Sequence, residues 1–193
     1  QHTDTQLYYR TDHHWTTEAA FYVYQNWADA QKLPVREADH YEIRTVTDAF
    51  EGTIQSKLGI HTVTDSIDLY LAEGDPFYTV QKNGSEEVDY SIYDYSALDT
   101  KDKYAVFFGG NQALVKISTR AKTDRRFLVI QDSYAHCFLP FLFEDASEID
   151  VVDLRYYNQK LSDLIAEGNY TDVLFLYNVA GFAEDTSLAK LLG

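Results

Sequence analysis

The sequence predicts an α/β protein whose parallel sheet is covered by helices on both faces, and three observations lead to this prediction. Phe127 to Ile130 form a short, continuous apolar run with β-branched residues, which is typical of a parallel strand buried on both faces. Strand-like and helical patterns then alternate to the end of the chain, and this order favours successive β–α–β units. With 193 residues, 45% of them hydrophobic, the chain is long enough to enclose a sizeable core.

The elements of this α/β part are expected after a polar linker at 119–125. The expected strands are 127–131, 149–154 and 172–177, and the expected helices are 134–143, interrupted by Pro140, 158–167 and 183–192.

The amino-terminal part is expected to begin with a strand-like segment and a helix. Leu7 to Thr11 is the strand-like segment. Thr16 or Thr17 is suited to cap the helix that follows, with Glu18 in its first turn. Apolar residues then recur at helical spacing on one face of that helix: Ala20, Val23, Tyr24, Trp27 and Ala28.

Two further elements should follow Pro34, which ends the helix. The alternation at 41–46 predicts a strand, and 50–59 is expected to be a loop with one helical turn.

Residues 66–118 have the pattern of an antiparallel β insertion within a single domain that spans 1–193. The candidate strands are 67–71, 77–81, 88–93, 104–108 and 113–117. Asn83-Gly84 is the strongest hairpin-turn signal. Gly109-Gly110-Asn111 is also interpreted as a turn, because no helix follows it that would complete a phosphate-binding loop.

Charge and composition exclude several classes of partner. The chain has 31 acidic and 16 basic residues, a formal charge of -15, which argues against nucleic acid and anionic membranes. The single cysteine, Cys137, excludes an internal disulfide and is expected to pack in the core. No segment approaches the run of about 20 apolar residues that spans a bilayer, and no signal peptide is visible. The protein is therefore expected to be cytoplasmic or to lack its targeting segment in this chain.

Three residues form the candidate chemistry. Ser133 follows the apolar run at the carboxyl end of a strand, where ligands bind in open parallel sheets. Asp12 and His14 are two apart, so on an extended segment they would project to one side, with His13 and Trp15 on the other. A histidine oriented by a carboxylate can act as the base for a serine nucleophile.

Simpler interpretations stay open at this point. Asp132 and Ser133 can cap the following helix, and His14 can be a satisfied polar residue at a helix start. Asp-His-His also resembles the signature of the DHH phosphoesterases, but those enzymes place further metal-binding aspartates upstream, and only eleven residues precede Asp12. No metal or other cofactor is therefore predicted.

Five motifs in this order resemble the bacterial DHHW protein family, which is similar to the SGNH-like domain of alginate O-acetyltransferases. They are Asp12-His13-His14-Trp15, Phe107-Phe108-Gly109-Gly110-Asn111, Val129-Ile130-Gln131-Asp132-Ser133-Tyr134, Pro140-Phe141-Leu142 and Val152-Asp153-Leu154-Arg155-Tyr156-Tyr157.

The resemblance implies a catalytic triad and an oxyanion hole. It assigns Ser133 as nucleophile, His14 as base and Asp12 as the residue that orients His14. The serine should then lie within about 4 Å of the histidine. The acid and the histidine precede the serine here, which implies a circularly permuted SGNH-like fold. The resemblance assigns the oxyanion hole to the Ser133 backbone and to Asn178, and substrate binding to Arg155, Tyr156 and Trp15.

The implied function is serine-dependent acyl transfer on an extracellular glycan, as an O-acetyltransferase or acetylesterase. The implied partners are an acetylated glycan or acyl donor and a membrane acyltransferase, and the implied location is extracellular or at the cell surface. The negative charge favours a neutral or amino-sugar polymer over a polyuronate. The alternative is a degenerate glycan-binding or scaffolding module, because Arg155-Tyr156-Tyr157-Asn158 replaces the oxyanion glycine expected after strand 149–154.

Overall fold

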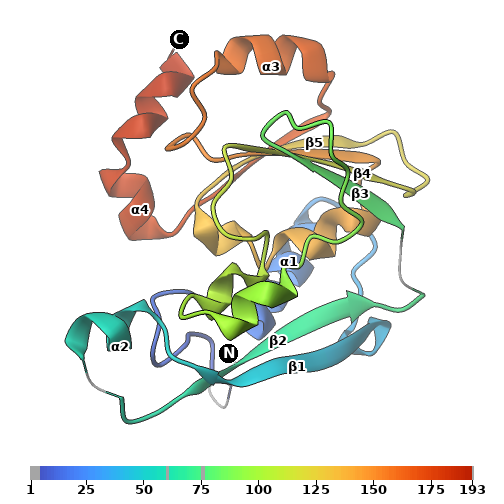
Figure 1. Cartoon of the computed structure of the whole chain (residues 1–193). Helices are drawn as coiled ribbons and strands as arrows, with labels where there is room; N and C mark the ends of the chain where they lie inside the picture. Colours follow the sequence, from blue (N-terminus) through green and yellow to red (C-terminus); the bar gives the residue numbers. More distant parts are fainter. Residues whose placement is uncertain (1–4, 60, 75–76, 193) are drawn as a thin grey trace. The chain divides into compact units, whose positions relative to one another are not determined.

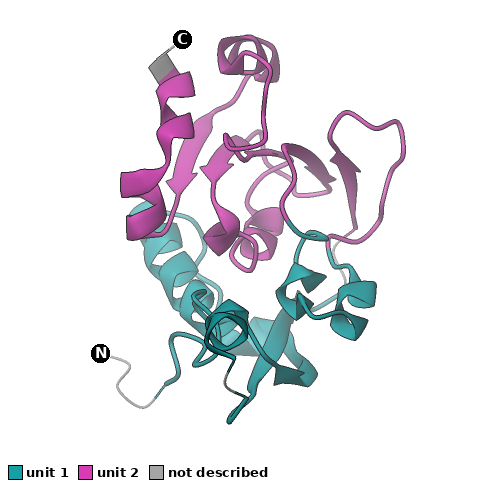
Figure 2. Ribbon diagram, turned by 60° about the vertical axis from the view of Figure 1, so that its left-hand side comes forward, with its two compact units in different colours: residues 1–75, 93–110 teal, residues 76–92, 111–193 magenta. Residues whose placement is uncertain are grey.

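The structure is a computed structural model that describes residues 5–59, 61–74 and 77–192. By its internal contacts the chain divides into two compact units. Unit 1 comprises Gln1–Asp75 and Tyr93–Gly110, and unit 2 comprises Pro76–Ile92 and Asn111–Gly193 (Figure 2). The single domain predicted for 1–193 stays a prediction.

Unit 1 is built on a long helix and a two-stranded antiparallel ribbon. The helix is α1 (Thr17–Ala30), and the strands are β1 (Tyr41–Phe50) and β2 (Asp65–Ala72) (Figure 1). Of the two predicted candidates, Thr16 and Thr17, the helix cap is Thr16, because its hydroxyl accepts from the backbone N–H of Ala19. The short helix α2 (Thr53–Leu58) follows β1 and supplies the expected helical turn.

Two predicted strands of unit 1 are absent from the described structure. Leu7–Thr11 contributes only one bridge, between Tyr8 and Trp15, so that residues 7–16 form a tight reversal of the chain. The run 104–108 is not a strand: the 3-10 helices η2 (Tyr95–Asp99) and η3 (Lys103–Val106) occupy this region. A short apolar run does not distinguish a buried strand from a buried helical turn. Positive φ values at Phe108, Gly109 and Gly110 then turn the chain, as expected for this glycine pair.

Unit 2 contains a five-stranded sheet with the order β3-β4-β6-β5-β7. Its strands are β3 (Tyr78–Lys82), β4 (Leu114–Thr119), β5 (Arg126–Gln131), β6 (Glu148–Val152) and β7 (Asp172–Leu176). β5 pairs in parallel with β6 and with β7, as predicted. The sheet as a whole is mixed, not parallel, because β4 runs antiparallel to both β3 and β6.

The short linker between β4 and β5 explains why β4 does not run parallel to the strands that follow it. A crossover between parallel strands needs about a dozen residues or more, whereas residues 120–125 are too few to contain a helix, so the chain reverses direction. β3 and β4 therefore extend the main sheet, and β2 lies in unit 1, so 66–118 does not form a separate antiparallel sheet. The predicted strand 88–93 is reduced to single bridges at Asp89 and Tyr93.

The Asn83-Gly84 turn forms as predicted. Both residues have positive φ, and the N–H of Ser85 donates to the carbonyl oxygen of Lys82, the pattern of a type I′ turn.

The helical segments of unit 2 lie on both sides of its sheet. α3 (Leu161–Gly168) and the 3-10 helices η4 (Ser133–Ala135) and η5 (Leu139–Glu144) are on opposite sides in Figure 1. The predicted helix 134–143 is thus two 3-10 pieces, since Pro140 cannot donate an intrahelical hydrogen bond. The closing helix is also divided, into α4 (Val179–Glu184) and η6 (Thr186–Leu192). Cys137 is buried, as expected.

Among the described residues, no helix is both long enough and apolar enough to cross a membrane.

Candidate active site

The turn that carries Ser133 is fixed by the aspartate before it. Ser133 is half-buried and begins η4 two residues after the end of β5. Asp132 is buried, and its Oδ1 accepts from the N–H of Tyr134 at 2.9 Å. This contact from residue i to i+2 is an Asx turn, which a short acidic side chain favours at a strand end. The capping role expected of Asp132 is therefore present, and it holds the serine at the carboxyl edge of the sheet.

Asn178 is joined to the same aspartate. β7 lies beside β5, so Asn178, two residues past β7, reaches Asp132. The Oδ2 atom of Asp132 accepts from the backbone N–H of Asn178 at 3.0 Å and from its Nδ2 at 2.5 Å. The Asn178 Oδ1 accepts from the N–H of Gly181 at 2.7 Å and caps α4. Both ends of the amide are thus oriented, and Nδ2 retains a second N–H that is not used by Asp132.

Gly181 makes this arrangement possible. A Cβ atom at that position would lie 2.6 Å from Nδ2 of Asn178 and 2.8 Å from Oδ2 of Asp132. Both distances are shorter than real Cβ contacts, so a larger residue would displace the amide.

Arg155 and Tyr156 follow β6, on the other side of β5. Arg155 donates through Nε and Nη2 to Asp153 at 2.9 and 2.6 Å, and Asp153 is fully buried. These hydrogen bonds raise the pKa of Arg155 above its ordinary value and outweigh burial, which lowers it. The guanidinium lies over the exposed ring of Tyr156, whose hydroxyl accepts from Asn111 at 3.3 Å. Unit 2 therefore presents Ser133, Asn178 and Arg155 from the ends of three neighbouring strands.

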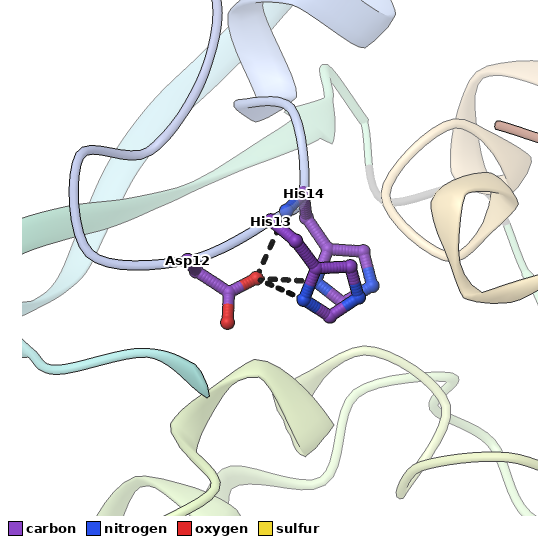
Figure 3. Close-up of side chains that lie close together, drawn as sticks. All are labelled: Asp12, His13 and His14. Atoms are coloured by element: carbon purple, nitrogen blue, oxygen red, sulfur yellow. Dashed lines mark hydrogen bonds and ion pairs between the residues drawn. The ribbon is translucent and has the colours of Figure 1, made fainter. Parts of the chain in front are cut away.

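Asp12 and His14 form a buried hydrogen-bonded pair in unit 1 (Figure 3). His14 Nδ1 lies 2.5 Å from Asp12 Oδ1, and the His14 backbone N–H donates to the same oxygen at 3.0 Å. This is again an Asx turn. Because Nδ1–H donates to the carboxylate, the neutral ring carries its lone pair at Nε2, as a general base requires.

The second oxygen of Asp12 is held by the start of α2. Asp12 Oδ2 accepts from the backbone N–H of Thr53 at 2.7 Å and from its hydroxyl at 2.9 Å. Burial alone would raise the pKa of Asp12, but hydrogen bonds from His13, His14 and Thr53 outweigh it and hold the pKa well below its ordinary value. A Cβ at Gly52 would meet the Asp12 side chain at 2.2 Å, so only glycine fits beside the carboxylate.

Aromatic contacts fix the plane of the His14 ring. It stacks on Tyr104 with centroids 3.8 Å apart and an interplanar angle of 10°. His13 does not project to the opposite side, as an extended segment would require, because the chain bends at 10–14. Its ring lies beside that of His14 (Figure 3), with the two ring centroids 3.9 Å apart. The Nδ1 atom of His13 is 2.7 Å from the Thr53 hydroxyl. Trp15 is half-buried and bridges to Tyr8.

Asp12, His13 and His14 are also close enough for their ligand atoms to surround a cation. The geometry fits a hydrogen bond better. Ligand atoms that share a tetrahedral ion lie about 3.3 Å apart, given metal–ligand bonds of about 2 Å, whereas Asp12 Oδ1 and His14 Nδ1 are 2.5 Å apart. Asp12 Oδ2 is also already used by Thr53.

Several supporting residues were not predicted from the sequence. Thr53 and Tyr104 are separated from Asp12 and His14 by other elements, and no spacing rule connects them. Gly181 lies three residues after Asn178, which is the spacing of a helix cap and its backbone donor. One signal was present: Thr53 follows a glycine at the start of a helical turn, where a free backbone N–H is available to a carboxylate.

The same part of unit 1 gives a prediction about acid stability. Asp65 accepts from the N–H and hydroxyl of Thr11 at 2.8 and 2.7 Å, and from Arg10 Nε at 3.1 Å. Burial raises the pKa of Asp65, but these hydrogen bonds lower it more, to below its ordinary 3.8. The unfolded carboxyl then takes up protons first, so this stabilisation is present above about pH 4 and is lost as the pH falls further.

We expect Asp65→Asn to lower the thermal midpoint by about 2–6 °C at pH 7, and by progressively less as the pH approaches 3. Thermal unfolding of both proteins over this range tests it, with Asp39→Asn, at an exposed position, as control. A difference that stays constant with pH would contradict the assignment.

Comparison with protein families gives a match to the DHHW protein model over residues 1–152. This chain belongs to the DHHW family. The match confirms the resemblance found in the motifs, including Asp12-His13-His14-Trp15. Ser133 also lies within the matched residues, whereas Arg155 and Asn178 lie beyond them. A comparison with curated proteins gives no match.

Solved structures extend the DHHW relationship to the fold. A DHHW family protein from Eubacterium siraeum is similar with a TM-score of 0.85 and 27% identity, covering 100% of this chain and 65% of that one. The structure of Bacillus cereus PatB1 with a sulfonyl adduct is similar with a TM-score of 0.79 and 24% identity, covering 95% of this chain and 64% of that one. A second structure of Bacillus cereus PatB1 is similar with a TM-score of 0.76 and 23% identity, covering 94% of this chain and 65% of that one. The chain thus spans slightly less than two thirds of these proteins.

Asp12 and His14 are thus together in unit 1, whereas Ser133 and Asn178 are together in unit 2. The predicted distance of about 4 Å between Ser133 and His14 stays a prediction.

Proposed function

We propose that this DHHW protein transfers acyl groups through Ser133, as an O-acetyltransferase or acetylesterase acting on a cell-surface glycan. The observation that carries the proposal is the buried Asp12–His14 pair, with Nδ1 to Oδ1 at 2.5 Å and the other carboxylate oxygen held by Thr53. A carboxylate fixed on both oxygens and a ring fixed by stacking are costly to bury without a role, and they match the base and orienter of a nucleophilic site.

The proposed reaction has two steps. His14 Nε2 takes the proton of Ser133 Oγ while the oxygen attacks the ester carbonyl, and the departing alcohol then receives that proton. In the second step a sugar hydroxyl or water gives its proton to His14 and attacks the acyl-enzyme carbonyl; the bond to Ser133 Oγ breaks, and His14 returns the proton to that oxygen. Charge on the carbonyl oxygen would be met by the Ser133 backbone N–H and by the second N–H of Asn178.

Similarity to PatB1 supports the proposal through the fold. At 23–24% identity it supports a shared architecture and no more. A PatB1 structure carries a sulfonyl adduct, and sulfonyl electrophiles are attacked by activated nucleophiles of the kind proposed for Ser133. An SGNH-like, circularly permuted arrangement is part of the proposal.

The substrate is proposed to be a neutral or amino-sugar glycan outside the cell. Tyr156 and Trp15 offer aromatic faces for sugar rings, and Arg155 offers donors, while the charge of -15 disfavours a polyuronate. Transfer would also need an acyl donor, for which a membrane acyltransferase is the proposed partner. These assignments follow from the family resemblance.

Covalent labelling tests the nucleophile. We expect a fluorophosphonate probe to modify the folded protein once, at Ser133, as read by peptide mass spectrometry. Ser133→Ala should abolish labelling, and Ser118→Ala, an exposed serine on β4, should not change it. Equal labelling of Ser133→Ala, or no labelling of a protein with an intact thermal midpoint, would reject the proposal.

A glycan-binding module without turnover is the second candidate. Arg155 favours it, because this large side chain, tied to buried Asp153, follows β6 where the SGNH pattern has a glycine. Glycan binding by a folded protein that the probe does not label would support this alternative.

A further inference from the structure

A cavity of about 710 Å³ lies in unit 2, and neither Ser133, Asn178 nor Arg155 is among the residues that line it. It is lined by the loop at 157–160, by α3 and by η6. Figure 1 shows α3 and η6 near each other on one side of the sheet. This volume is typical of sites for small organic ligands, which range over about 300–1,000 Å³.

One part of the lining is apolar and accessible. Ile165 of α3 is 48% exposed and Leu191 of η6 is 38% exposed. Leu161, also in the lining, is buried and anchors α3 in the core. A ligand with an apolar body would cover the two exposed side chains, and this burial is favourable.

The other part of the lining is basic. Lys160 and Lys190 are the charged residues among those that line the cavity, and the acidic residues of α3, Asp163 and Glu167, are not part of it. Neither lysine forms an ion pair with a carboxylate in the part of the chain that the structure describes. Lys190 Nζ donates to the carbonyl oxygens of Leu154 and Tyr157 at 2.6 and 2.7 Å, which fixes its position and leaves a third N–H.

We propose that this cavity binds a small amphipathic anion, with an apolar chain against Ile165 and Leu191 and its anionic head at Lys160 and Lys190. A chain of net charge -15 repels anions in general, so two lysines in one cavity, neither of them paired with a carboxylate among the described residues, create a local exception. Lys160 and Lys190 present ammonium groups, which bind carboxylate and phosphate heads as point charges.

Calorimetric titration with octanoate, octyl phosphate, octanol and acetate tests the proposal. We expect octanoate or octyl phosphate to bind with a Kd below about 1 mM, and the tighter of the two identifies the head group. Octanol lacks the charge and acetate lacks the apolar chain, so each should bind at least five times more weakly than the tighter of the two octyl anions. If octanol binds as tightly as both anions, or if neither anion binds at 1 mM, the proposal is wrong.

Two variants locate the site. Lys160 is exposed, and its side chain forms no hydrogen bond or ion pair within the described residues, so Lys160→Gln should fold normally and weaken anion binding about three- to tenfold. Ile165→Ser should weaken the octyl ligands several-fold. Lys122→Gln, another exposed lysine of unit 2, is the matched control and should change nothing. Equal effects of Lys160→Gln and Lys122→Gln would place the bound anion elsewhere and overturn the proposal.

Discussion

Replacing Asp12 by asparagine is expected to lower the turnover of a small acetyl ester by about four orders of magnitude. Each oxygen of Asp12 accepts from a backbone N–H, Oδ1 from His14 and Oδ2 from Thr53. An asparagine must therefore direct its NH2 group at one of these donors. With the amide oxygen facing Thr53, the NH2 group donates to His14 Nδ1, which shifts the ring proton to Nε2 and removes the base.

The opposite orientation of the amide would place its NH2 group against the N–H of Thr53, so that two donors face each other. The free energy of unfolding is therefore also expected to fall, by about 1–3 kcal/mol. Turnover is therefore measured together with the thermal midpoint and expressed per folded molecule. Asp39→Asn, at an exposed position, is the control. A folded Asp12→Asn protein with more than a tenth of the original turnover would remove Asp12 and His14 from the proposed mechanism.

Replacing Asn178 by alanine is expected to reduce turnover by about two to three orders of magnitude, with KM changed little. The reason is that an oxyanion donor acts mainly in the transition state. The Asn178 amide is held by Asp132 at 2.5 Å and by Gly181 at 2.7 Å, so its second N–H has a fixed direction. Steady-state kinetics separates kcat from KM and tests this expectation.

Alanine also removes the cap of α4, which costs about 1 kcal/mol, so a second variant separates the two roles. Asn178→Ser can still accept from Gly181 but has no amide donor. We expect Asn178→Ser to be as slow as Asn178→Ala while unfolding at a higher temperature. Gly181→Ala should also slow turnover, because its Cβ would displace the amide. If all three variants keep normal turnover, Asn178 is only a helix cap.

Local signals in the sequence predicted the elements that depend on neighbouring residues. The cap at Thr16, the Asn83-Gly84 turn and the strand before Ser133 each depend on a few consecutive side chains and were recognised correctly. The Asp12–His14 pair was predicted from spacing on an extended segment, but the structure forms it through an Asx turn. The predicted contact between Asp12 and His14 is present, but the predicted extended backbone is not. The extended backbone is the reason why His13 was expected on the opposite side.

What the sequence alone determined is therefore local: the family motifs, the carboxylate–histidine pair and the serine at a strand end. The tertiary structure decided the contacts between distant segments: the antiparallel part of the sheet, Thr53 on the second oxygen of Asp12, and the clamp of Asn178 on Asp132. The physical reason is the sequence separation of the residues that interact. A cap or an Asx turn is selected by steric and hydrogen-bonding preferences within about four residues, whereas strand order and a donor 41 or 46 positions away depend on how the whole core packs.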